Sequence, residues 1–260
     1  MTGFGIGLAV SAAAVVLLMA GTFAVARKAG KHSVVDVSWG LGFAAVALSS
    51  LAVATGNGTR SVLLAGMVVL WGGRLAWHIG RRNAGHGEDP RYSELLSKAP
   101  PERRTAYALR MIYGLQGVLI LVISLPVQVG MHADAELGPL AVLGVAVWGL
   151  GLFFEAVGDH QLQAFKSDPA NRGKVLDRGL WRWTRHPNYF GDACVWWGIW
   201  LVAAETGVGA LTVLSPIVMT FFLTKGTGAA LTEKRMAGRP GFAEYARRTS
   251  GFVPLPPKQR

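Results

Sequence analysis

Cysteine and charged residues are both scarce in this chain. The 260 residues include one cysteine, Cys194, so no disulfide can form within the chain and a disulfide-stabilised secreted scaffold is excluded. Only 16% of the residues are charged, against roughly 25% in soluble domains. Hydrophobic residues make up 51% of the chain. This composition excludes an ordinary soluble domain and is typical of a membrane protein.

Three kinds of binding motif are missing as well. No Gly-x-Gly-x-x-Gly run follows a strand, so any nicotinamide site has to be built between helices. The six histidines are scattered and form no cluster with ligand spacing, so we expect no metal site. No recognisable DNA-binding module is present, and we expect no nucleic-acid partner.

Long stretches without Asp, Glu, Lys or Arg are the main feature of the sequence. A helix that crosses a bilayer needs about 20 mostly apolar residues. Five stretches are free of formal charge, and two more are interrupted once each, by Arg74 and by Asp192. The seven expected spans are residues 1–26, 37–59, 61–80, 111–133, 137–154, 189–204 and 206–224. The sequence therefore predicts an all-α, polytopic membrane helical bundle with about seven transmembrane helices.

The surplus of basic residues indicates how this bundle is threaded. The formal net charge is +11, and Lys and Arg gather in alternate loops, whereas the loop with Asp134 and Glu136 is acidic. Because basic loops stay on the cytoplasmic side, we expect the amino terminus outside and the carboxyl terminus in the cytoplasm. We expect one membrane domain over residues 1–260, with substrate-side residues in 1–135 and a cofactor site in 136–260. Membrane lipids are expected partners, through contact of the basic loops with anionic headgroups.

Ionisable residues near the cytoplasmic ends of the spans are candidate site residues, because charge at membrane depth is costly. One helical stripe on the third span runs to the boundary and would suit phosphates: Arg74, His78, Arg81 and Arg82. The alternative is that Arg81 and Arg82 extend to headgroups and Arg74 pairs with an acid. A second set, spaced by four on the fifth span, would suit ribose hydroxyls or an amide: Glu155, Asp159 and Gln163. These acids are equally candidates to pair with Arg74 and Arg110.

The segment 179–192 is the densest in functional residue types. Pro187 favours the first turn of a helix, so the sixth span is expected to begin there with its amino end at the cytoplasmic face. The free N–H groups of that end, with Arg182 and Arg185 beside them, predict an anion site. The alternative is an interfacial aromatic belt of Trp181, Trp183 and Tyr189 with basic anchors.

These residues together resemble a known family. The matching runs are Val35-Asp-Val-Ser-Trp39-Gly, Arg81-Arg-Asn83, Thr184-Arg-His-Pro-Asn-Tyr-Phe-Gly-Asp192 and Arg248-Thr-Ser-Gly-Phe-Val-Pro254. They are similar to the steroid 5-alpha-reductases, and most of all to the uncharacterised bacterial membrane proteins that share their C-terminal domain. The resemblance covers nearly the whole chain. It implies an integral protein of the bacterial inner membrane, in which a helical bundle binds NADPH from the cytoplasmic side and reduces a lipophilic, steroid-like enone or olefin.

Site residues follow from the resemblance position by position. It implies that Asp159 holds the cofactor, and that Lys234, Arg235 and Tyr245 of the tail close over the nucleotide. The cofactor-binding residues expected in all are Arg74, His78, Arg81, Arg82, Asn83, Glu155, Asp159, Gln163, Arg182, Arg185, His186, Asn188, Tyr189, Asp192, Lys234, Arg235 and Tyr245. NADPH suits the basic surplus, because Arg binds phosphate oxygens in pairs.

The chain departs from the steroid reductases at the substrate. It has no Gln-Glu pair on the second span to polarise a carbonyl, and Asp36 and Trp39 are the nearest candidates. A donor must stabilise charge as hydride adds to a conjugated double bond, and a proton source must complete the reaction. Asp36, Trp39 and Tyr113 are therefore the candidate catalytic residues, and His78 is an alternative donor.

Two other functions compete with the reductase. The run Arg185-His-Pro-Asn-Tyr-Phe-Gly191 is similar to one in the isoprenylcysteine and phospholipid methyltransferases, which bind S-adenosylmethionine. Those enzymes usually carry a Glu-Glu pair in the tail, whereas this chain has Glu233 followed by Lys234. A non-enzymatic membrane protein, such as a transporter or lipid-binding scaffold, is the third hypothesis. The lack of a visible repeat and the crowding of polar groups at one side argue against transport.

Overall fold

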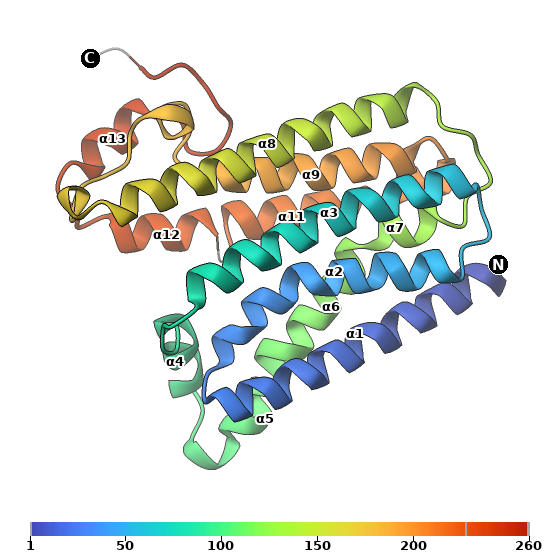
Figure 1. Cartoon of the computed structure of the whole chain (residues 1–260), viewed down its shortest axis with the longest axis horizontal. Coiled ribbons are helices and arrows are strands. Elements are labelled where there is room, and N and C mark those ends of the chain that lie inside the picture. The colour runs from blue at the N-terminus through green and yellow to red at the C-terminus, as the bar shows by residue number, and fades with distance from the viewer. Residues whose placement is uncertain (1, 227, 259–260) are drawn as a thin grey trace. The chain divides into compact units, whose positions relative to one another are not determined.

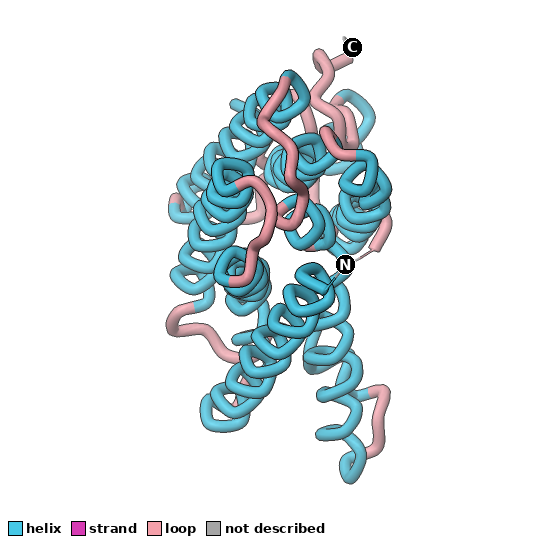
Figure 2. The backbone as a smooth tube through the Cα atoms, turned by 90° about the vertical axis from the view of Figure 1, so that its right-hand side faces the viewer, coloured by secondary structure: helices cyan, strands magenta, loops and turns pink. Residues whose placement is uncertain are grey.

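The computed structural model describes residues 2–226 and 228–258. Helices and loops make up this part of the chain, and the one β-type contact in it is an isolated parallel bridge between Thr184 and Ser250 (Figure 2). The predicted all-helical class is confirmed. Met1, Thr227, Gln259 and Arg260, which the predicted domain includes, lie outside the described residues.

Six helical stretches of the described residues are long and apolar enough to cross a membrane. Their bounds are Gly3–Ala29, His32–Ala52, Gly58–Asn83, Pro101–Ile123, Pro139–Ser167 and Gly207–Met236. The seventh expected span, 189–204, lies in helix α9 (Pro187–Ala204), which is not among the six. The first turns of α9 carry Asn188 and Asp192, and these polar residues lower the apolar character of its 18 residues.

The chain divides into two compact units, Met1–Leu140 with Val202–Ser215, and Ala141–Leu201 with Pro216–Arg260. The first unit contains three long helices, α1 (Thr2–Ala29), α2 (Val35–Ala52) and α3 (Gly58–Asn83), with α2 packed against both others (Figure 1). Its shorter helices are α4 (Pro90–Ser97), α5 (Arg104–Ala108), a π-helical turn (Leu109–Gly114), α6 (Leu115–Ile123), α7 (Leu125–Gly130) and α10 (Gly207–Ala210).

Helices α2 and α3 approach closely because each has a glycine at their crossing. A Cβ on Gly40 would lie 2.4 Å from the Gly72 carbonyl oxygen, and one on Gly72 would lie 2.5 Å from that of Gly40. Phe43 and Trp71 fill the space beside the crossing, with ring centroids 5.5 Å apart. Small residues of this kind let helices pack in lipid, where no hydrophobic force drives them together.

The second unit is built on α8 (Pro139–Ser167) and α9. It also contains most of α11 (Leu214–Thr224), and the short helices α12 (Ala229–Met236) and α13 (Phe242–Arg248) of the tail (Figure 1). Helix α9 begins at Pro187, as the sequence predicts. The loop with residues 181–186 leads directly into the first residue of α9. The side chains at the end of this loop are therefore held next to the start of the helix.

Glycines also bring α8 and α9 together. Gly144 and Gly151 of α8 lie seven residues apart, as do Gly191 and Gly198 of α9. A Cβ on Gly151 would lie 2.5 Å from the Gly191 carbonyl oxygen, and one on Gly198 would lie 2.5 Å from that of Gly144. The two backbones are therefore in contact over two turns of helix, and this rigid pair supports the polar residues described next.

Candidate functional site

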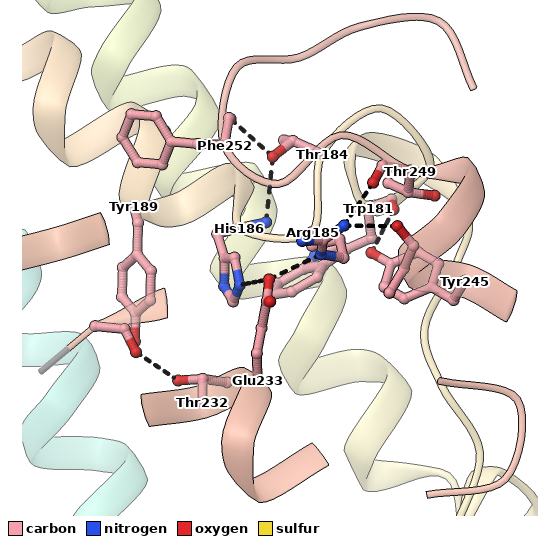
Figure 3. A network of polar contacts seen from close by, with 12 residues as sticks. Trp181, Thr184, Arg185, His186, Tyr189, Thr232, Glu233, Tyr245, Thr249 and Phe252 are labelled. Carbon is pink, nitrogen blue, oxygen red and sulfur yellow. Dashed lines mark hydrogen bonds and ion pairs between the residues drawn. The ribbon is translucent and has the colours of Figure 1, made fainter. Parts of the chain in front are cut away.

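Arg185 joins the loop before α9 to both tail helices. Its Nε donates to Glu233 Oε1 of α12 at 2.8 Å, and its Nη1 donates to the carbonyl oxygens of Ala246 and Thr249, each at 2.8 Å (Figure 3). The Arg185 backbone N–H donates to Ser250 O at 2.9 Å. One guanidinium thus connects the loop before α9 with α12 and the end of α13, and two of its three nitrogens donate hydrogen bonds within the protein.

His186 shares the same carboxylate. Its Nε2 lies 3.0 Å from Glu233 Oε1, and its ring stacks on Tyr189 with centroids 5.4 Å apart. His186 is 3% exposed, and this burial lowers its pKa below the ordinary value, although the hydrogen bond to Glu233 acts in the opposite direction. We therefore describe His186 as a neutral imidazole near pH 7 that donates to Glu233.

A second group of bonds fixes the aromatic wall beside this network. The Tyr245 hydroxyl donates to the Trp181 carbonyl oxygen at 2.6 Å, and Trp181 Nε1 donates to Gly158 O of α8 at 3.1 Å. Burial raises the pKa of Tyr245, so its hydroxyl keeps its proton. Gly179 adopts a positive φ of 61° where a Cβ would lie 2.6 Å from Gln161, and Gln161 accepts from Leu180 N at 3.0 Å. Trp181 is thereby bonded to α8 through its indole N–H and to Tyr245 of α13 through its carbonyl oxygen.

These side chains line an open cavity of about 760 Å³. Its apolar wall includes Trp181, Tyr245 and Phe242, which are all buried. Its cationic residues are Lys166, Arg172, Lys174, Arg185, Arg235 and Arg239, and Asp168 is its one carboxylate. The volume falls in the roughly 300–1,000 Å³ range of small-molecule sites. The second unit therefore contains a cavity with aromatic walls and a strongly basic rim.

The cavity collects four of the residues that the sequence predicts for the cofactor: Arg185, His186, Arg235 and Tyr245. Arg239, Phe242 and Trp181 also line the cavity and were not predicted to bind the cofactor. Lys166, Arg172 and Lys174 belong to a basic loop that was interpreted only as a determinant of topology. In the second unit, three of the remaining predicted residues are exposed and do not line the cavity: Gln163, Arg182 and Lys234. Their assignment to a cofactor stays a prediction.

Other predicted residues lie in the α8–α9 pair. Glu155, Asp159 and Asp192 are buried, with 2%, 8% and 8% of their surface exposed. Asn188 Nδ2 donates to Asp159 Oδ1 at 3.1 Å, so the two predicted residues do meet. The acids of α8 and the first turns of α9 thus form one buried polar layer in the second unit.

The predicted stripe on α3 belongs to the first unit. Arg74 and His78 are half-buried, whereas Arg81 and Arg82 are exposed at the end of the helix. The Arg81 guanidinium lies 5.6 Å from the centroid of the Trp77 ring, and Arg82 Nε donates to Asn83 Oδ1 at 3.3 Å. This set stays a prediction for cofactor binding.

The candidate catalytic residues also lie in the first unit. Asp36 Oδ2 accepts from Arg91 Nη2 at 2.8 Å, and Asp36 Oδ1 accepts from the Tyr92 hydroxyl at 2.5 Å. Burial and the Asp36 carboxylate raise the pKa of Tyr92, which remains a protonated donor. Arg91 and Tyr92 were not predicted as site residues. They follow Glu88 and Asp89 in a segment that was interpreted only as a basic loop. The Trp39 ring packs on Phe43 at 5.1 Å.

Tyr113 occupies the π-helical turn Leu109–Gly114. Its hydroxyl lies 2.8 Å from His32 Nδ1, and its ring packs edge-on against Phe23 at 5.3 Å. π-Helical turns are rare and recur at functional sites. The position of Tyr113 in such a turn therefore supports its candidacy in a way that the residue type alone does not. Among the described residues, no group of three His, Cys, Asp or Glu side chains is arranged to hold a metal ion.

The sequence matches the family described as "Protein of unknown function (DUF1295)" over residues 22–249. The chain belongs to this family. No curated protein and no solved structure matches it. The DUF1295 match includes every predicted site residue, from Asp36 to Tyr245, and the whole lining of the cavity. The proposal of a function for this DUF1295 protein is therefore based on its fold and its cavity.

Proposed function

We propose that this DUF1295 membrane protein is an NADPH-dependent reductase that transfers hydride to a carbon–carbon double bond of a lipophilic, steroid-like or enone substrate. The observation that supports this most directly is the basic cavity of about 760 Å³ in the second unit. It combines what a dinucleotide needs, which is cations for phosphates and flat apolar walls for the rings.

The donor set of the cavity fits NADPH in particular. The cofactor carries a pyrophosphate and a 2′-phosphate, and the cavity presents Arg172, Lys174, Arg235 and Arg239 as exposed cations. Arg forks bind phosphate oxygens in pairs, and Lys adds a point charge. S-adenosylmethionine is a sulfonium cation without phosphate, so this basic rim favours the reductase over the methyltransferase. The cavity lining has six cationic side chains and one carboxylate, Asp168, so its net positive charge would repel the sulfonium of S-adenosylmethionine.

The residues of the chain have distinct roles in this proposal. Arg235 and Arg239 bind phosphate, while Trp181 and Phe242 contact the rings. Arg185, with Glu233, holds α12 against the loop before α9, so it positions the wall that carries Arg235. NADPH, when bound, supplies the hydride. Asp36, Trp39 and Tyr113 are proposed to bind and protonate the substrate, with the cofactor side of the protein in the cytoplasm.

Binding of NADPH, NADH and S-adenosylmethionine to the detergent-purified protein tests the proposal. We expect tight NADPH binding and weaker NADH binding. A charge-assisted hydrogen bond contributes about 1.5–3 kcal/mol, so Arg235→Ala and Arg239→Ala should each weaken NADPH binding by about tenfold or more. Arg247→Ala is the matched control, since Arg247 is exposed on α13 and does not line the cavity.

Three outcomes would contradict the proposal. Binding of S-adenosylmethionine alone would make the protein a methyltransferase, and binding of none of the three would favour a non-enzymatic role. Equal losses in Arg235→Ala and Arg247→Ala would place the nucleotide outside this cavity. If NADPH binds, its oxidation in the presence of lipid enones measures the reduction itself, and Asp36→Asn and Tyr113→Phe should lower that rate with little change in NADPH affinity.

A further inference from the structure

The loop before α9 and the end of the tail present apolar side chains that the described residues of the second unit leave about half exposed. Trp183 is 45% exposed, and Val253 and Leu255 are each 53% exposed. Together we call these three residues the tail patch. They come from two segments, the loop before α9 and residues 249–258 after α13, which we call the strap, so their exposure is not explained by the fraying of one terminus.

Hydrogen bonds hold the two segments side by side. Leu255 N donates to the Trp183 carbonyl oxygen at 3.0 Å, and Thr184 Oγ1 donates to Phe252 O at 2.8 Å. Exposure alternates from residue 252 to residue 255, since Val253 and Leu255 are exposed while Pro254 is half-buried and Phe252 packs on Phe190 with ring centroids 6.0 Å apart. The strap therefore turns one set of side chains inward and presents the tail patch outward, in a fixed arrangement.

The length of α8 places this patch at the membrane boundary. The helix has 29 residues and so extends about 43 Å, whereas the hydrocarbon core of a bilayer is about 30 Å thick and takes about 20 residues. Counting about 20 residues from Pro139 reaches Gly158. Trp181, two residues before Trp183, donates to the Gly158 carbonyl oxygen. With the hydrocarbon core beginning at the first turn of α8, the loop with Trp183 lies at the depth where hydrocarbon gives way to headgroups.

The charges around the patch are basic. Arg182 is exposed and precedes Trp183 in the chain. Lys258 is exposed at the end of the strap, where its backbone N–H donates to Arg248 O at 2.9 Å. Arg247 is exposed next to Arg248, and the nearby acid Asp177 is paired with Arg248. Tryptophan together with Lys and Arg is the composition typical of membrane interfaces, where basic side chains are attracted to anionic lipid headgroups.

We propose that the tail patch docks on the anionic phospholipid headgroups of the bilayer that the chain spans. Trp183, Val253 and Leu255 insert at the headgroup level, and Arg182 and Lys258 contact phosphates. The proposal does not depend on a reductase activity, because it concerns a surface outside the cavity.

Fluorescent labels on single cysteines test this placement. In the full chain with Cys194→Ala, an environment-sensitive label is attached to Val253→Cys, Leu255→Cys or the control Lys174→Cys, whose side chain lines the open cavity. The proteins are placed in nanodiscs of phosphatidylcholine with or without phosphatidylglycerol. Lipid-borne nitroxide near the headgroup should quench the labels at 253 and 255 at least twofold more than the label at 174, and water-soluble acrylamide should show the reverse order.

The anionic component has its own readout. Phosphatidylglycerol should increase nitroxide quenching at 255, and Arg182→Gln with Lys258→Gln should abolish that increase without changing the melting temperature. Acrylamide quenching at 253 and 255 equal to that at 174 would overturn the proposal, because the patch would then face water. Quenching independent of phosphatidylglycerol would overturn the assignment to anionic headgroups.

Discussion

Arg60 Nη2 lies 2.9 Å from Glu205 Oε2, and the Arg60 side chain has no exposed surface. Its Nε also donates to Ala135 O at 3.1 Å, and Glu205 Oε2 accepts from Gly138 N at 3.0 Å. The start of α3, the loop before α8 and the segment after α9 are thus joined in the first unit by one buried ion pair. This pair accounts for Arg60, the one charged residue between the second and third expected spans.

Arg60→Met should destabilise the protein strongly. It leaves Glu205 buried without its cation, a change that costs about 3–5 kcal/mol in buried pairs. The double variant Arg60→Met with Glu205→Gln removes both charges, and it should recover part of the loss. Thermal unfolding in detergent measures both. Equal melting temperatures for the two variants would show that the ion pair itself contributes little.

Gly151→Ala should separate α8 from α9, because the new methyl group would lie 2.5 Å from the Gly191 carbonyl oxygen and 2.6 Å from Val195 N. Backbone atoms cannot move aside at low cost, and overpacking costs about 1–3 kcal/mol. Gly149→Ala is the control on the same helix, since nothing lies within 4 Å of its Cβ position. The control should be neutral or stabilising by up to about 1 kcal/mol through helix propensity. A similar melting temperature for both variants would contradict the close crossing.

Acidification should weaken the protein through His186. Burial lowers its pKa in the folded state, so below pH about 6.5 the unfolded chain binds a proton that the folded chain does not. Stability is therefore highest above the unfolded pKa and falls as the pH drops through it towards the folded value. His186→Gln keeps a donor to Glu233 without a titrating group, and its melting temperature should change less between pH 7.5 and 5.5. Parallel pH profiles would exclude His186 as the cause.

The predicted threading can be tested by labelling. In the Cys194→Ala background, an impermeant maleimide should label Asp134→Cys in intact cells, whereas Lys174→Cys should react only after the membrane is opened. Both positions are exposed in the structure, so access within the protein does not limit the reaction. The opposite pattern would invert the topology and place the basic cavity outside the cytoplasm.

The membrane helices were predictable because the absence of charge over about 20 residues is itself the physical requirement for crossing a bilayer. The expected start of α9 at Pro187 is confirmed for a similar reason, since proline constrains the local backbone. The number of spans was harder to predict, since the sequence predicts seven and six of the described helical stretches are apolar enough to cross a membrane. Asp192 and Asn188 make the first turns of α9 polar, and a sequence window cannot tell whether such a helix is covered by its neighbours.

The cavity was harder to predict than the helices. Arg185 was recognised as important, but its acceptors Ala246 O and Thr249 O are backbone atoms 61 and 64 residues away, and backbone atoms leave no signature in the sequence. Arg172 and Lys174 were interpreted as topology determinants, because nothing local shows that the tail folds back over their loop. The pairing of Asp36 with Tyr92 is hidden for the same reason, since it joins residues 56 apart.

The wall of the cavity has a consequence for the order in which the protein is made. Residues 162–186 supply one side of it, whereas residues 232–245 supply the other and are synthesised later. All but the last of the spanning helices are therefore synthesised before the cavity can close. A nascent chain that stops ahead of Glu233 has the earlier spanning helices but lacks the carboxylate that Arg185 and His186 share. Closure of the cavity thus requires the tail, and membrane insertion of the earlier helices alone does not provide it.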